Sequence, residues 1–297
     1  MRQAICDLTV ELIDFNLILK MHRNKILIVG LKDTDAGKTT LARAMLSYLR
    51  EEGFDACGFK PMAGNNVWYD YDVISEALSE GRLYGKDAKF LRKASGGDVS
   101  EELINPVHRL WSEPPLINLN LPSSFPSIIL DRVTLWSGEP RDILVENKTL
   151  SFNNEEEEKL LEKLHHRADD IYKIDDLESL NEITEKYYGQ AIRSAYKKLL
   201  DRYDPIVIEG YGDVALPWSE LDDLDLVVGV EPWHISIYNP DKYLNAVKFS
   251  IPTYSNEIST RRIKELVKPV KEVEFLPFRS DERVEMLKEK VPLILDI

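Results

Sequence analysis

Residues 26–41 of the chain read ILIVGLKDTDAGKTTL. The four apolar residues at the start of this stretch predict a short, buried parallel strand. A polar loop follows the strand and ends in Gly37, Lys38 and Thr39, where a helix with one apolar face begins. A strand, a polar loop, Gly-Lys-Thr and a helix in this order are typical of a phosphate-binding loop.

Each part of this loop has a role in binding phosphate. Backbone N–H groups at a helix N-terminus point toward an anion, and the helix dipole stabilises it there. Lys38 adds positive charge at the β- and γ-phosphates, and the Thr39 hydroxyl is a ligand for Mg²⁺. Six residues separate Gly30 from Gly37, where the common pattern has four. An ordinary strand-to-helix turn is the alternative, but the flanking strand and helix patterns favour a phosphate loop.

The composition of the chain limits which partners and which cellular compartment we expect. The chain has 297 residues, enough for one large α/β domain or two small ones, and a net charge of −14. This acidic balance argues against a nucleic-acid or anionic membrane surface. Cys6 and Cys57 do not make a disulfide framework, and no apolar stretch reaches transmembrane length. We therefore expect a cytoplasmic protein with neither nucleic acid nor membrane as a partner.

Strands alternate with helices along most of the chain. This alternation predicts an α/β fold of the P-loop NTPase kind, with a mostly parallel sheet and helices on both faces. Residues 1–22 are expected to be an N-terminal extension, whose apolar spacing fits a helix nearly as well as a strand. Residues 23–297 are expected to form one P-loop ATPase domain, with an inserted or lengthened segment at about 112–200.

Local patterns predict several further elements. Residues 65–71 are polar and aromatic and are expected to form a loop, and the proline-rich stretch 104–126 is expected to be irregular. Two apolar runs at 128–135 and 143–145 predict a hairpin, with its turn in the Ser-Gly-Glu-Pro sequence between them. A helix is predicted at about 182–202.

A second apolar run, at 206–208, ends in Glu209 and two nearby glycines. In P-loop proteins a strand beside the phosphate loop delivers an acid to the magnesium site, and Glu209 is placed for this role. Lys60 follows another predicted strand, at the end where open α/β sheets bind ligands. Asp70 and Asp72 open a helix, where an acid often acts as a cap, and one of them is also a candidate metal ligand.

With these motifs in view, the chain resembles dethiobiotin synthetase and its wider P-loop family, which includes the amidating synthases of corrinoid biosynthesis. The likeness is collinear and spans roughly residues 25–280. The matching stretches are DTDAGKT at 33–39, GFKP at 58–61, INP at 104–106, IEGYG at 208–212 and VVGV at 227–230.

The resemblance implies a Mg²⁺-dependent ATPase or ligase, expected to be a homodimer, that acts on a small-molecule substrate. Lys38 and Lys60 would be catalytic, and Lys60 would stabilise negative charge on a carbamate or acyl phosphate. Thr39, Asp72 and Glu209 would bind Mg²⁺, with Asp70 as the alternative to Asp72. The residues that the resemblance implies in binding ATP are Thr34, Asp35, Ala36, Gly37, Lys38, Thr39, Thr40 and Asn256.

The chain departs from the family pattern on the substrate side. Gly64 stands where the family usually has a substrate-contacting serine, and Tyr211 and Asp213 replace small residues. These departures predict a substrate other than that of dethiobiotin synthetase. The main alternative is a nucleotide-dependent switch or assembly ATPase with a protein partner. A GTPase is a third possibility, which is disfavoured because the Asn-Lys at 147–148 is not followed by the Asp of a guanine motif.

Overall fold

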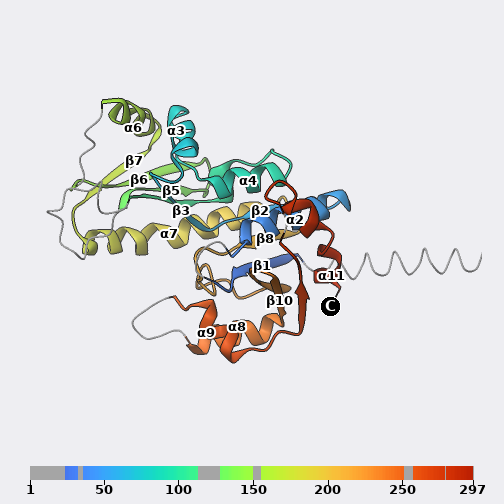
Figure 1. Ribbon diagram of the computed structural model, residues 1–297. Coiled ribbons are helices and arrows are strands. Elements are labelled where there is room, and N and C mark those ends of the chain that lie inside the picture. The colour runs from blue at the N-terminus through green and yellow to red at the C-terminus, as the bar shows by residue number, and fades with distance from the viewer. Residues whose placement is uncertain are drawn as a thin grey trace, which may run out of the picture. The chain divides into compact units, whose positions relative to one another are not determined.

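The structure is a computed structural model that describes residues 24–32, 36–112, 128–149, 155–250, 257–277 and 279–296. It contains two compact units (Figure 1), one within residues 1–56 and 204–297 and the other within residues 57–203. The expected extension at 1–22 lies outside the described residues. The expected lengthened segment at 112–200 falls within the second unit. A single P-loop domain that spans 23–297 stays a prediction.

A mixed sheet forms the centre of the first unit. Five of its strands lie in the order β11-β10-β9-β1-β8. The central strand β1 pairs in parallel with both β8 and β9, while β10 pairs antiparallel with β9 and β11. The strands of this unit are β1 (Lys25–Gly30), β8 (Ile206–Glu209), β9 (Leu226–Glu231), β10 (His234–Tyr238) and β11 (Lys271–Glu274). The apolar residues of β1 are fully buried, as expected for a central parallel strand.

The first helix of this unit follows directly from the apolar spacing in the sequence. Helix α2 buries Leu41, Met45 and Leu49, which lie one turn apart on one face, and it packs against β1 and β8. The chain leaves the helix at Gly53, whose φ of 90° suits a glycine beyond a helix end. The helices of the unit are α2 (Lys38–Glu51), α8 (Pro240–Ser250), α9 (Thr260–Leu266), α10 (Arg283–Lys288) and α11 (Val291–Leu295).

A second mixed sheet, in the order β3-β4-β5-β6-β7, organises the second unit. Its outer pairs, β3 with β4 and β6 with β7, are parallel, and its inner pairs are antiparallel. The predicted hairpin is confirmed, because β5 and β6 pair antiparallel across the short turn between them. The strands of the unit are β2 (Cys57–Phe59), β3 (Met62–Asn66), β4 (Val107–Trp111), β5 (Ile128–Leu135), β6 (Arg141–Asn147) and β7 (Asp170–Ile174). Together the two units confirm a mixed α/β fold.

Helices cover both faces of this second sheet (Figure 1). Helices α3 and α6 cover one face, where Ile74, Leu130, Leu144 and Leu164 share an apolar core, and α7 packs along the other face. The predicted helix at about 182–202 corresponds to α7, which starts earlier, at Leu177, and ends at Leu200. The helices are α3 (Tyr71–Ser79), α4 (Lys86–Ala94), α5 (Glu101–Ile104), α6 (Glu155–Arg167) and α7 (Leu177–Leu200). Across the described parts of both units, every helix is too short or too polar to span a membrane.

Two strands overlap stretches that the sequence pattern predicted to be loop or irregular. The expected irregular stretch at 104–126 contains β4, so that prediction is wrong for Val107–Trp111. Strand β3 likewise extends into the expected loop at 65–71. In β4 the charged Arg109 forms an ion pair of 2.7 Å with Asp131 of β5, which is fully buried. A segment with charged residues can therefore form a strand when the adjacent strand supplies a partner of opposite charge. The local sequence pattern does not reveal that partner.

Candidate functional site

Two predicted metal ligands meet in the first unit at the end of two parallel strands. Ile28 of β1 lies opposite Glu209 of β8, so the two strands end at the same edge of the sheet. Helix α2 starts directly after β1 and its loop, and it places Thr39 in its first turn. The Thr39 hydroxyl donates to Glu209 Oε1 at 2.7 Å, and Glu209 is fully buried. A hydroxyl and a carboxylate, two oxygen donors of the kind that Mg²⁺ accepts, are therefore in contact.

The N-terminus of α2 has the features of an anion site. Gly37 precedes the helix with a φ of 96°, a left-handed conformation that glycine adopts without strain. The helix has neither a side-chain cap nor an acidic residue in its first turn. Its first backbone hydrogen bond runs from Leu41 N to Gly37 O, at 3.0 Å. The amides of Lys38, Thr39 and Thr40 thus precede the first i to i−4 hydrogen bond of the helix and lie at the positive end of its dipole.

The Lys38 side chain folds back toward the loop that follows β8. Its Nζ donates to the carbonyl oxygen of Gly212 at 2.6 Å. A Cβ at position 30 would lie 2.9 Å from the same Nζ, so glycine at this position leaves room for the lysine. The contacts of Lys38 with Gly30 and Gly212 were not predicted, although a glycine at the end of β1 and another in the loop after β8 were visible in the sequence. Ala36, beside Gly37, is buried at the same turn.

The loop after Glu209 is tied to the start of α9. Ser259 Oγ donates to the Asp213 carboxylate, and Thr260 N donates to Asp213 O at 2.6 Å. The buried Thr260 hydroxyl donates in turn to Gly30 O, at the end of β1. Asp213 departs from the family pattern, and here it joins the loop that receives Lys38 to a helix more than forty positions further along the chain.

Lys60, the second predicted catalytic lysine, lies in the second unit. Its side chain is 4% exposed and forms an ion pair of 2.9 Å with Asp87. Its backbone N donates to Ile104 O, and the Asn105 side chain donates to Lys60 O, each at 2.8 Å. The INP stretch therefore fixes the backbone of the GFKP stretch, which joins two of the motifs that carry the family resemblance. Whether Lys60 is catalytic stays a prediction.

The two candidate aspartates at the start of α3 differ in their surroundings. Asp70 is the N-cap residue and accepts a hydrogen bond of 2.7 Å from Asn65 Nδ2. Asp72 is exposed in the first turn of the helix. Within the described residues, no group of three or more His, Cys, Asp or Glu side chains is arranged to hold a metal. The proposed set of Thr39, Asp72 and Glu209 therefore stays a prediction.

Thr34, Asp35 and Asn256, which the resemblance implies in binding ATP, lie outside the described residues. No protein-family model matches the chain. No curated protein matches it either. The likeness to dethiobiotin synthetase therefore rests on the short motifs alone.

Proposed function

We propose that the chain is a Mg-ATP-binding P-loop ATPase or ligase resembling dethiobiotin synthetase. In this proposal, phosphoryl transfer from ATP activates a carboxylate or carbamate of a small molecule, and a nucleophile then displaces phosphate. The observation that carries the proposal is the 2.7 Å contact between Thr39 and Glu209 at the start of α2. An anion-binding helix start beside a hydroxyl–carboxylate pair is the arrangement that phosphoryl transfer needs.

Each residue has a distinct role in this proposal. The first amides of α2 and the Lys38 ammonium hold the phosphates, so Lys38 exchanges Gly212 O for a phosphate oxygen. Thr39 and Glu209 hold Mg²⁺, with Asp72 added from the family resemblance. When bound, Mg²⁺ neutralises charge on the phosphates. Lys60 stabilises the negative charge that develops on the acceptor. Catalysis is then mainly positioning and charge stabilisation.

A nucleotide-dependent switch is a second candidate, which the contacts of Lys38 favour. Lys38 reaches Gly212, and the adjoining Asp213 is bonded to Ser259 and Thr260 at the start of α9. A phosphate that draws Lys38 away from Gly212 would therefore alter a loop connected to α9. Turnover with ATP alone, compared with turnover after addition of a metabolite pool, distinguishes the switch from the ligase.

The Lys38→Ala substitution tests the phosphate site directly. A charge-assisted contact to phosphate contributes about 1.5–3 kcal/mol, which corresponds to roughly a 10- to 100-fold change in affinity. We expect Lys38→Ala to lower the affinity for ATP by at least about tenfold and to abolish hydrolysis, while the affinity for adenosine changes little. Titration calorimetry with each ligand measures this difference. Lys248→Ala, at an exposed position in α8, is the control. Equal ATP affinity in Lys38→Ala and the wild type would refute the phosphate site.

A further inference from the structure

The second unit contains a pocket that the proposed ATPase site does not use. Its volume is about 650 Å³, within the range of small-molecule sites. The lining comes from Arg82, which follows α3, from Arg92 of α4, from the chain around α5, from the β5–β6 hairpin, and from the end of α6 with the residues that follow it. Five carboxylates and three guanidinium groups are among the lining side chains. The pocket is thus strongly polar, with an excess of negative charge.

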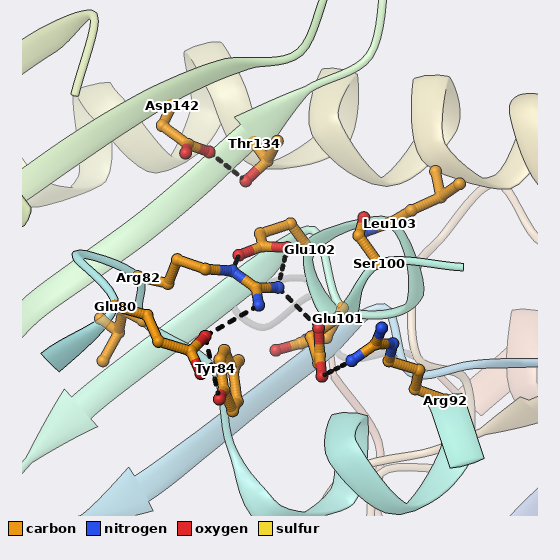
Figure 2. A network of polar contacts seen from close by, with 12 residues as sticks. Glu80, Arg82, Tyr84, Arg92, Ser100, Glu101, Glu102, Leu103, Thr134 and Asp142 are labelled. Carbon is orange, nitrogen blue, oxygen red and sulfur yellow. Dashed lines mark hydrogen bonds and ion pairs between the residues drawn. The ribbon is translucent and has the colours of Figure 1, made fainter. Parts of the chain in front are cut away.

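A network around Arg82 forms one wall of this pocket (Figure 2). The Arg82 guanidinium donates to Glu101 at 2.6 Å and to both oxygens of Glu102 at 2.7 Å, and it forms an ion pair with Glu80. Burial is the largest single effect and raises the pKa of Glu102, but the hydrogen bonds from Arg82 together with the positive charges of Arg132 and Arg82 hold this pKa below its ordinary value. Three carboxylates therefore occupy the Arg82 guanidinium, and it is not the group that receives a ligand.

Arg92 of the lining pairs with Glu101 at 3.1 Å, whereas Asp142, Asp169 and Arg167 form no ion pair within the described residues. Asp142 accepts a hydrogen bond of 2.6 Å from the buried Thr134 hydroxyl, which fixes its orientation (Figure 2), and its backbone N donates to Asp169 at 2.7 Å. Arg167, at the end of α6, donates only to the carbonyl oxygen of Glu80, at 3.3 Å. A cation and two anions thus line the same pocket without neutralising each other through direct contacts.

We propose that this pocket binds a zwitterionic amino acid. The ligand carboxylate pairs with Arg167, which presents a planar fork of donors suited to a carboxylate. The ligand ammonium pairs with Asp142 and Asp169. The excess of carboxylates favours an amino acid with a second positive charge. The proposal does not depend on ATP binding by the first unit.

Titration calorimetry of the full chain with L-lysine tests the proposal. Putrescine, which has the amines without the carboxylate, and succinate, which has carboxylates without an amine, are the comparison probes. The variants Asp142→Asn and Arg167→Gln each remove one charge from the pocket, the first with a side chain of the same size and the second with a shorter polar one. Asp175→Asn and Lys163→Gln, two exposed sites outside the lining, are the matched controls.

We expect saturable binding of L-lysine, at least about tenfold weaker binding of putrescine and succinate, and a similar loss in each pocket variant. The control variants should stay within about twofold of the wild type, since their charges lie outside the pocket. Thermal unfolding confirms that each variant is folded. Arg167 is exposed, so Arg167→Gln remains a usable test if Asp142→Asn fails to fold. The proposal would be overturned if L-lysine does not bind, if both pocket variants bind it as tightly as the wild type, or if putrescine binds as tightly as L-lysine.

Discussion

Replacing Glu209 by Gln separates a magnesium ligand from a structural residue. The carboxylate is fully buried and accepts a 2.7 Å hydrogen bond from Thr39. A hydrogen bond to a charged group contributes about 1.5–3 kcal/mol and a neutral one about 0.5–1.5 kcal/mol, so the substitution weakens this bond by about 1 kcal/mol. Burying an ionised carboxylate costs several kcal/mol, and a neutral amide avoids most of this cost. The two effects oppose each other, so we expect Glu209→Gln to be at least as stable as the wild type without nucleotide.

Thermal unfolding with and without Mg-ATP provides the assay. A ligand at 100 times its dissociation constant stabilises the folded state by about 2.7 kcal/mol. The wild type should show a stabilisation of this order, and Glu209→Gln should lose most of it together with Mg²⁺-dependent turnover. Glu231→Gln, at the end of β9 on the other side of β1, makes the same chemical change as a control. An unchanged Mg-ATP response and unchanged turnover in Glu209→Gln would show that Glu209 is structural.

Two further predictions follow from the second unit and from the substrate side. Burial and the nearby Arg132 lower the pKa of His108 to about 3, so the unfolded chain binds its proton first as the pH falls. The free energy of unfolding should therefore decrease between about pH 6.5 and pH 3, by roughly 1.4 kcal/mol per pH unit from this group. Urea titrations at several pH values measure this dependence, and the free energy of unfolding should fall less steeply with decreasing pH in His108→Gln than in the wild type. An equal pH dependence in the two proteins would contradict the assignment. Because Gly64 and Tyr211 alter the substrate side, we expect ATP hydrolysis but little dethiobiotin from diaminopelargonic acid, bicarbonate and Mg-ATP, as product analysis would show; efficient synthesis would refute this expectation.

The sequence by itself determined the elements whose signals are local. The local sequence predicts β1 from its apolar run, and it predicts the start and the buried face of α2 from Gly37 and from the spacing of apolar residues. The β5–β6 hairpin and most of α7 were also predicted, since long apolar runs and helical periodicity need no distant partner. The candidate site was predicted as a set of residue types, with Glu209 chosen because an acid ends an apolar strand. Its contact with Thr39 is an observation that only the structure supplied.

Tertiary structure decided the pairing of polar groups. Glu101 and Glu102 resemble a solvated acidic pair in the sequence, yet both are buried because Arg82, about twenty positions earlier, binds them. Strand β4 was unforeseen for a similar reason, since Arg109 is tolerated there through Asp131 on the next strand. A buried charge is stable only beside a partner that offsets its lost hydration, and such partners come from remote parts of the chain. Local sequence patterns do not predict pairings between distant residues, so these pairings are seen only in the folded structure.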